Sequence, residues 1–234
     1  MLSLALATAV TLVTPADCSG SGLNPLRSAG CRAIAADEAF AGMAELANTN
    51  AAFRAYMLPD GLLFRPGPVE ARIALDTEAP GSPLRWHPAV ALVDAGGDAV
   101  VTSGPWSLTG RDGTVYTGYY VTVWERSASE PRIRWDFGNL GPTLPDAAYA
   151  QLYAEVLAGG GPVHLTDAEL PGLVPAAELA TSCMLDGGRT AHPGQDLRTT
   201  YADQPGTTPE AGPACQRWTV VSNAQALIVV DSVN

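Results

Sequence analysis

The chain has 234 residues, which is enough for one large domain or for two domains of ordinary size. Apolar residues make up 47% of it, a share that supports a packed core and argues against global disorder. The formal net charge is −11 and every basic residue is Arg, so we expect no nucleic-acid partner and no membrane contact beyond the N-terminal segment described next.

Residues 1–16 are apolar, rich in Ala and Leu, and too short to span a bilayer comfortably. Ala7-Thr8-Ala9 and Thr14-Pro15-Ala16 both offer the small residues that signal peptidases prefer. The segment therefore predicts a signal peptide cleaved near Ala16 and a secreted or periplasmic bacterial protein, although a basic start is missing. The alternative is a buried N-terminal helix.

Cysteine usage agrees with export. No C-x-x-C motif or Cys/His cluster has metal-ligand spacing, so we expect no metal and no cofactor. All the cysteines are candidates for disulfide bonds: Cys18, Cys31, Cys183 and Cys215. Proximity in sequence favours the pairs Cys18–Cys31 and Cys183–Cys215, and the alternative is a set of free, buried thiols.

Helices are expected first along the chain. Residues 17–32 contain Gly, Ser and Pro and predict a linker. Apolar residues at helical spacing then predict an amphipathic helix over 33–47. Two shorter helices, over 51–57 and 69–76, flank a Pro-Asp-Gly turn and a short strand at 62–65.

A β-meander follows the helices. Alternating apolar residues and turn signals predict strands over 85–93, 99–108, 114–126 and 132–137. In the last strand, strict alternation would place Asp136 on the outer face with Arg132 and Arg134. Residues 33–139 therefore predict an α+β domain with a mostly antiparallel sheet.

The second half of the chain resembles part of the first. The segment 57–61 is similar to 184–187, and Arg85-Trp86 to Arg217-Trp218, in the same order. We therefore expect a linker over 138–145 and a diverged or truncated second copy over 146–234. Its predicted elements are a helix over 146–158 and strands over 217–222 and 226–233.

Several short motifs carry a resemblance to a known family. These are Ala-Asn-Thr-Asn-Ala-Ala-Phe (47–53), Leu-Phe-Arg-Pro-Gly-Pro (63–68), Arg-Trp-x-Pro (85–88), Gly-Pro-Trp (104–106), Tyr-Val-Thr-Val-Trp (120–124) and Trp-Asp-Phe-Gly (135–138). In this order they resemble exported SnoaL-like, ketosteroid-isomerase-like proteins of unknown function, in the nuclear-transport-factor-2-like superfamily. The resemblance covers about 33–139 and implies a cone: a curved antiparallel sheet packed on three N-terminal helices around an apolar pocket.

The resemblance implies no single activity, because the superfamily includes isomerases, cyclases, dehydratases, binding modules and assembly domains. An isomerase needs a carboxylate base in an apolar cavity. Asp60, Glu70 and Asp136 are candidates, and each also has a structural explanation as a turn residue, a helix start or a ladder member. His87 shows no orienting partner in the sequence, and His164 and His192 lie in loops without ligand spacing.

The pocket of such a cone would be lined by aromatic residues and one cation. The candidates are Tyr56, Phe64, Arg65, Trp86, Trp106, Tyr119 and Trp135. Arg65 is suited to hold a carboxylate or enolate, or else forms an ion pair that fixes the neighbouring turn.

Three functions follow from these expectations. The first is an exported domain that binds a small apolar molecule in the pocket, without demonstrated catalysis. The second is an isomerase, cyclase or dehydratase that uses the same pocket, which a buried carboxylate facing it would support. The third is a dimerising scaffold, which joint exposure of Tyr116, Tyr120 and Trp124 would support.

Overall fold

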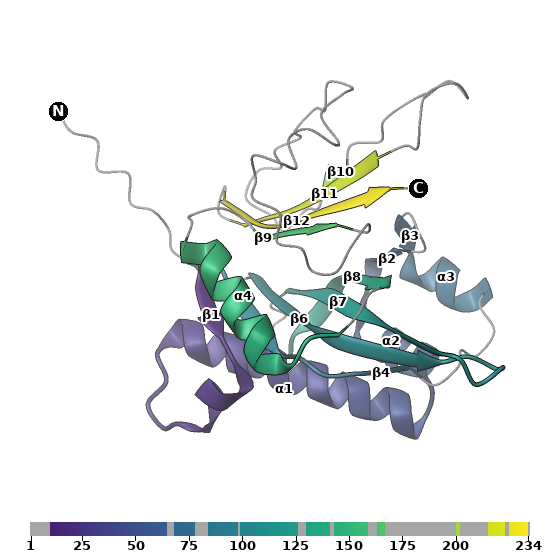
Figure 1. Cartoon of the computed structure of the whole chain (residues 1–234), viewed down its shortest axis with the longest axis horizontal. Coiled ribbons are helices and arrows are strands. Elements are labelled where there is room, and N and C mark those ends of the chain that lie inside the picture. Colours follow the sequence, from purple (N-terminus) through teal and green to yellow (C-terminus); the bar gives the residue numbers. More distant parts are fainter. Residues whose placement is uncertain are drawn as a thin grey trace.

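The structure is a computed structural model that describes residues 10–64, 68–77, 84–97, 99–125, 130–140, 143–158, 163–166, 200–201, 215–222 and 225–233. It confirms the predicted fold class: an α+β arrangement in which helices pack on a curled, unclosed sheet (Figure 1). The main sheet has the strand order β1-β5-β6-β7-β8-β2-β3, and β4 pairs with β6 beside this path. All its pairs are antiparallel except β2 with β8.

The chain enters the main sheet earlier than the sequence suggests. Strand β1 (Thr11–Val13) pairs with β5 (Val90–Val93), and the Val13 side chain is completely buried. The 3₁₀ helix η1 (Pro15–Ser19) follows at once. Cleavage near Ala16 would therefore remove a strand of the sheet, and the buried N-terminal helix considered as the alternative is not formed by residues 10–16.

Helix α1 runs over Pro25–Leu46, so the linker predicted over 17–32 is wrong for its second half. Asn24 caps the helix by accepting a hydrogen bond from the backbone N–H of Arg27, and Pro25 occupies the first turn, where no intrahelical donor is required. The Asn-Pro pair is the signal that marks this start. Gly and Ser further along obscured it.

Helix α2 (Thr49–Tyr56) is capped by Asn48 and leads into β2 (Met57–Phe64). The predicted Pro-Asp-Gly turn lies inside β2, where the pairing with β8 shifts register between Met57 and Leu62. The edge strand β3 (Pro68–Glu70) and helix α3 (Ala71–Thr77) follow.

The meander contains β4 (Leu84–Trp86), β5, β6 (Ala99–Thr109), β7 (Val115–Glu125) and β8 (Arg132–Leu140). The strand predicted over 85–93 is therefore two strands, with a break at His87 and Pro88. At this break the backbone passes close over Gly104, where an added Cβ would lie 2.1 Å from the His87 carbonyl oxygen. Only glycine leaves room for that approach.

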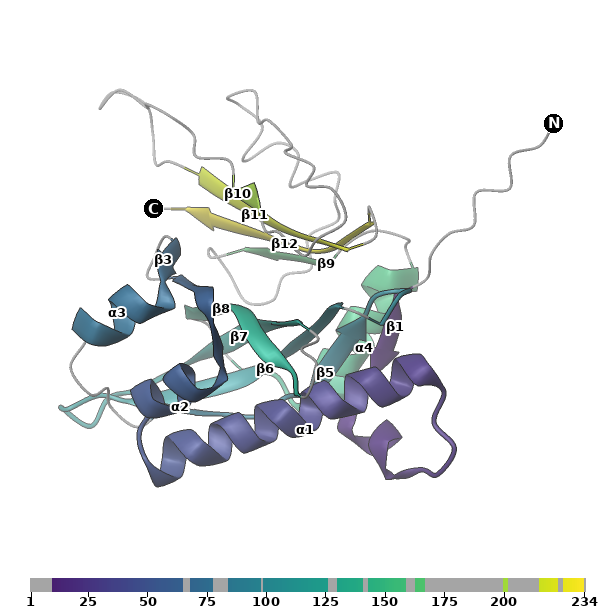
Figure 2. The same ribbon diagram turned by 180° about the vertical axis from the view of Figure 1, so that it is seen from behind.

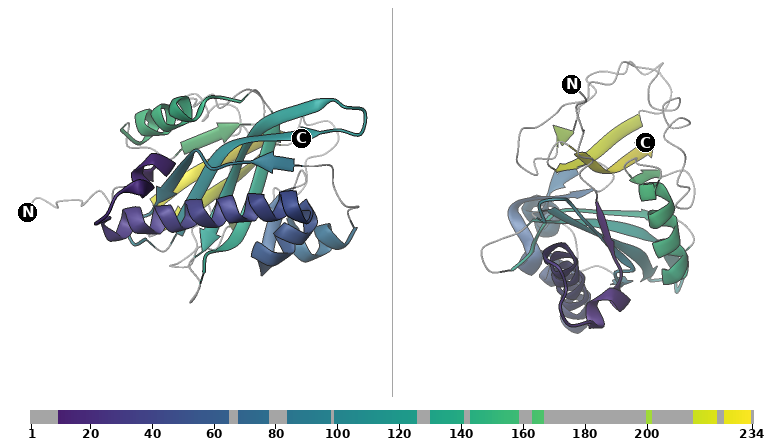
Figure 3. Two further views of the ribbon diagram at one scale, coloured as in Figure 1. Left: turned by 90° about the horizontal axis from the view of Figure 1, so that it is seen from below. Right: turned by 90° about the vertical axis from the view of Figure 1, so that its left-hand side faces the viewer.

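The main sheet is covered on both faces. Helix α1 lies across the inner face, where Ile34 and Phe40 pack with Val100 and Trp124 (Figure 3). Helix α4 (Asp146–Ala158) covers the outer face, where Tyr149 and Tyr153 pack with Val101 and Val121. The sequence assigned α4 to the second copy, but it belongs to the core of the first sheet.

The remaining described strands form a second sheet, drawn above the main sheet in Figures 1 and 2. Its members are β9 (Val163–Thr166), β10 (Thr200–Tyr201), β11 (Cys215–Ser222) and β12 (Gln225–Val233), in the order β10-β11-β12-β9. β11 and β12 correspond to the two strands predicted there. The repeated motif at 184–198 lies outside the described residues, so the second copy stays a prediction.

Candidate functional site

The candidate site is built around Asp37 on the inner side of α1. Asp37 follows Ile34 by three residues and precedes Phe40 by three, so helical spacing places its carboxyl group on the buried stripe of the helix. Its side chain is completely buried. A carboxyl group at such a position needs hydrogen-bond partners to compensate for the loss of water.

Those partners come from the strands that face α1. The Trp86 indole N–H on β4 donates to Asp37 Oδ1 at 2.9 Å. The Thr102 hydroxyl on β6 and the Tyr120 hydroxyl on β7 donate to Oδ2 at 2.6 and 2.8 Å. Thr102 in turn accepts the Trp124 indole N–H at 2.7 Å, so the network ties α1 to the centre of the sheet.

Burial dominates the electrostatics of this network. Loss of water raises the pKa of Asp37 from 3.8 to about 6, because the hydrogen bonds from Thr102, Trp86 and Tyr120 offset only part of the desolvation and nearby Asp136 raises it further. Burial, followed by the charge of Asp37, raises the pKa of Tyr120 well above 10.0. Asp37 is therefore the group of this network that changes protonation near neutral pH.

A second carboxyl group, Asp136 on β8, lies on the same face. It is buried and accepts the Thr122 hydroxyl at 2.7 Å, which corrects the outer position that strict alternation predicts. The cause is a register shift where β8 pairs with β7 between Val123 and Trp124, which reverses the alternation along β8. Ile133 therefore packs in the inner core, while Trp135 and Phe137 pack in the outer one.

Aromatic rings continue the site along α1. Phe40 lies within 4.6 Å of Trp86, 4.9 Å of Phe53, 5.3 Å of Tyr56 and 6.4 Å of Trp124, measured between ring centroids. Edge-to-face and tilted contacts of this kind are favourable for aromatic pairs. The inner face thus joins a small hydrogen-bonded acid cluster to an aromatic cluster.

The predicted pocket residues divide between the two faces. Tyr56 and Trp86 lie half-buried on the inner face, and Trp106 is directly opposite Trp86 in the pairing of β4 with β6. Tyr119 and Trp135 instead pack in the outer core beneath α4. The side chain of Phe64 and all of Arg65 lie outside the described residues, as do His192 and Cys183.

The other predicted acids are placed at the surface. Asp60 is exposed and pairs with Arg134 at 2.8 Å, and Arg134 also contacts Glu125 at 2.6 Å. Glu70 pairs with Arg72 at 2.6 Å.

His87 has the partner that the sequence did not reveal. Its Nε2 lies 2.9 Å from Asp146 Oδ1 at the start of α4, and both side chains are about half exposed. This pair attaches α4 to the end of β4.

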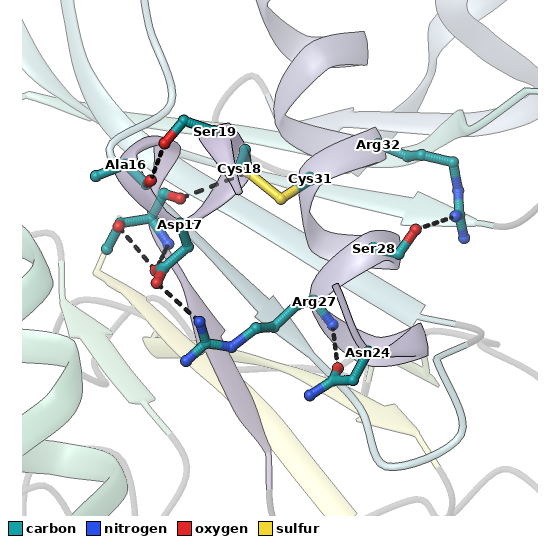
Figure 4. The surroundings of a disulfide bond; sticks show 10 residues. Ala16, Asp17, Cys18, Ser19, Asn24, Arg27, Ser28, Cys31 and Arg32 are labelled. Atoms are coloured by element: carbon teal, nitrogen blue, oxygen red, sulfur yellow. Dashed lines mark hydrogen bonds and ion pairs between the residues drawn. A yellow bond between two sulfur atoms is a disulfide. The ribbon is translucent and has the colours of Figure 1, made fainter. Parts of the chain in front are cut away.

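The disulfide between Cys18 and Cys31 confirms one of the two predicted pairs (Figure 4). It joins η1 to α1, and Arg27 supports it by donating to Asp17 at 3.1 Å. The backbone N–H and hydroxyl of Thr14 lower the pKa of Asp17. Because such bonds persist in oxidising surroundings, the pair indicates an oxidising compartment.

The described residues contain no group of three or more His, Cys, Asp or Glu arranged to hold a metal ion. Among the same residues, no helix has both the length and the apolarity to cross a membrane.

Asp37 was missed in the sequence because acids in an amphipathic helix are usually assigned to its solvent face. Its place between Ile34 and Phe40 on the apolar stripe was the available signal.

No protein-family model matches the chain, and no curated protein matches it. Among solved structures it is similar to a Xanthomonas campestris protein described as a calcium/calmodulin-dependent protein kinase II association domain, at 16% identity, with 49% of this chain and 89% of that chain covered and a TM-score of 0.36. It is also similar to a protein of unknown function with a cystatin-like fold from Methylobium petroleophilum, at 15% identity, 48% and 80% coverage, and a TM-score of 0.30. Because both scores are low, the fold description depends on the strand order and packing given above.

Proposed function

We propose that this protein is an exported binding domain that takes a small, mainly apolar molecule on the inner face of the main sheet, beside Asp37. The observation that carries the proposal is the placement of a few convergent polar groups among aromatic rings. Small-molecule sites typically combine an apolar, aromatic lining with a small number of polar groups that fix orientation. Here the polar groups are Asp37, Thr102 and Tyr120, and the aromatic groups are those around Phe40.

Trp86 marks the side from which a ligand would approach. Of the three Asp37 partners, Thr102 and Tyr120 are buried, whereas Trp86 is only half-buried. Trp86 lies on a three-residue strand that pairs with β6 alone. A short strand with one partner is held by few backbone hydrogen bonds, so its movement disturbs the sheet least.

We also propose membership of the SnoaL-like, nuclear-transport-factor-2-like group. The order of motifs over 33–139 supports this, together with the α+β fold and its curled sheet.

Export is part of the same proposal, because a disulfide is expected in proteins of oxidising compartments. Since β1 begins at Thr11, processing after Ala9 fits the fold better than processing near Ala16. The mass of the mature protein from a periplasmic fraction distinguishes a start at Val10 from a start at Asp17.

Binding is tested with the neutral fluorescent probe N-phenyl-1-naphthylamine. We expect saturable binding at one site, and about a tenfold loss of affinity in Trp86→Ala and in Tyr56→Ala, because each removes an aromatic contact worth about 1.4 kcal/mol. Tyr116→Ala is the matched control, since Tyr116 is 42% exposed on β7 and is not one of the groups that donate to Asp37. Equal affinity in all the variants would place the probe elsewhere and contradict the proposal.

Acid–base catalysis at the same site is the second candidate. The specific observation in its favour is the pair of buried carboxyl groups, Asp37 and Asp136, of which Asp37 has a pKa of about 6. A carboxyl group with a pKa near the working pH can exchange protons with a bound substrate. Deuterium exchange at the α-carbon of bound cyclic ketones, followed by NMR, tests this function. Exchange that is unchanged in Asp37→Asn would exclude Asp37 as the base.

A specific observation weighs against the scaffold function. Its expected patch of Tyr116, Tyr120 and Trp124 is not formed, because Tyr120 and Trp124 are buried on the inner face.

A further inference from the structure

We infer that the ligand of the inner site is an amphipathic amine: an ammonium group carried on an apolar body, with the ammonium directed at Asp37. This inference depends on the proposed binding function and adds the chemical class of the ligand. It follows from the remaining hydrogen-bond capacity of the site, from its charges and from its aromatic surroundings.

The remaining hydrogen-bond capacity of Asp37 favours a ligand that donates a hydrogen bond. A carboxylate oxygen has two lone pairs, and Asp37 Oδ2 uses both of its own to accept from Thr102 and Tyr120. Oδ1 accepts only from Trp86 among the described residues, which leaves one acceptor position. A ligand that meets Asp37 must therefore present an N–H or O–H group, and a ligand carboxylate or ketone would meet an acceptor.

The negative charge of Asp37 favours a ligand that carries a positive charge. Asp37 and Asp136 both lie on the inner face, and the influences on Asp37 include no cationic group of the described structure. Among the described residues, the arginines of β4 and β8 are engaged elsewhere, and Arg132 of β8 donates to the carbonyl oxygen of Ala55. Arg85 on β4 pairs with Glu45 at 3.4 Å, and Arg134 on β8 pairs with Glu125 and Asp60. A bound ammonium would give Asp37 a positively charged partner in a region of low dielectric, where such pairing is strong.

The aromatic surroundings also suit a cation. Trp86 donates to Asp37 and its ring also contacts Phe40, while Tyr56 and Trp124 continue the wall. Ring faces attract ammonium groups, and Trp does so best. The same rings would cover the apolar body of the ligand. Because Phe40 and Trp124 are buried, the ligand would reach them past the half-buried Trp86 and Tyr56.

The charge on Asp37 makes this binding depend on pH. The titratable groups that face Asp37 are Asp136 on β8 and Tyr120 on β7, and Tyr120 stays neutral because burial raises its pKa. An alkyl ammonium keeps its charge throughout the acid and neutral range. Amine affinity should therefore decrease as Asp37 is protonated at acid pH, whereas the affinity of a neutral ligand should not.

The experiment compares three probes of equal chain length by displacement of N-phenyl-1-naphthylamine from the full-length protein: decylamine, 1-decanol and decanoate. At pH 7.5 we expect decylamine to bind at least about tenfold more tightly than 1-decanol, and decanoate to bind most weakly. At pH 5 the decylamine advantage should shrink about tenfold, because only about a tenth of Asp37 then remains ionised. The affinity of 1-decanol should stay constant.

Asp37→Asn should remove both the amine preference and its pH dependence. Glu38→Gln is the matched control, since Glu38 is the exposed neighbour on the same helix, and it should bind as the wild type does. If Asp37→Asn does not fold, the pH profile of the wild type still decides. Equal binding of decylamine and 1-decanol at pH 7.5 would overturn the amine assignment and leave the binding function in place. Failure of every probe to bind, the naphthylamine included, would instead contradict the proposed function.

Discussion

The two faces of the main sheet are built from alternate residues of the same strands, yet they have different chemistry. The inner face, under α1, buries the polar side chains of Thr102, Tyr120 and Thr122 with two aspartates. The outer face, under α4, is packed by Val101, Val121 and Val123 with tyrosines of the helix. On this face the Tyr153 hydroxyl donates a hydrogen bond to Ser103 Oγ at 2.7 Å.

The difference separates two roles. An apolar face such as the outer one holds a helix mainly through buried area. Burial of carboxyl groups costs free energy of desolvation. Such groups are therefore found only where hydrogen bonds offset that cost. Burial of apolar area alone therefore does not explain the residues of the inner face, and four tests examine that contrast.

The largest effect is expected at Gly104, which the backbone of His87 approaches closely. In Gly104→Ala the new Cβ would lie 2.1 Å from the carbonyl oxygen of His87, which is backbone and cannot rotate away. We expect a loss of ~4 kcal/mol or more in unfolding free energy. Gly42→Ala is the control, because a Cβ there meets no atom within 4 Å, and it should stabilise α1 by about 0.5–1 kcal/mol in urea unfolding. Similar stability of the two variants would contradict the close approach.

The second effect is a pH dependence that belongs to the inner face. Between pH 3.8 and about 6 the folded protein keeps a proton on Asp37 that the unfolded chain has released, because burial raises the folded-state pKa. This contribution therefore favours folding at low pH and is lost as pH rises, by about 3 kcal/mol in total. Unfolding curves at pH 4 and pH 7 measure it, and Asp37→Asn should lack it. A wild type and variant with parallel pH profiles would show that Asp37 titrates normally.

The third effect concerns the disulfide bond that joins η1 to the start of α1. The Cys18–Cys31 bond closes a short loop with a sequence separation of 13 residues. Its loss in Cys18→Ala/Cys31→Ala should lower stability by about 3 kcal/mol in the chain-entropy model. A reducing agent should lower the melting temperature of the wild type by breaking the Cys18–Cys31 bond. The double variant has no such bond to break. Insensitivity of the wild type would mean that η1 is held without the bond.

The smallest effect compares two tyrosines of α4 on the outer face. The Tyr153 hydroxyl donates to Ser103, whereas no described residue lies within hydrogen-bonding distance of the buried Tyr149 hydroxyl. Tyr153→Phe should lower stability by about 1 kcal/mol, and Tyr149→Phe should be neutral or raise it by about as much. The two variants differ from the wild type by one oxygen atom each, so thermal unfolding of the pair serves as its own control. A reversed order would mean that Tyr149 has the better partner.

Local patterns predicted most of the fold. Alternation and turn signals located β6 and β7 to within one residue at each end, and helical spacing located α4 completely. The patterns failed where a feature depends on contact with another strand. The break at His87 and Pro88 is set by the approach to Gly104, and the position of Asp136 is set by a register shift. Neither neighbour is visible in the local sequence.

The site was less predictable than the fold for the same reason. Trp86 and Tyr56 were found because large aromatic side chains are obvious candidates for a lining. Asp37 required a comparison of one acid with the apolar stripe of its helix, and its partners come from strands far along the chain. Their convergence is a property of tertiary structure, which composition and periodicity do not contain.

The strand order has a consequence for how the protein is made. Thr11 pairs with Val93, and Leu63 pairs with Asp136. Strands β1 and β2 therefore cannot pair until segments much later in the chain have been synthesised. Pairing between distant segments is slow, since the intervening chain must first be brought together. The newly made polypeptide thus stays open until most of it has been translated. The main sheet can therefore be completed only after β8 has been synthesised.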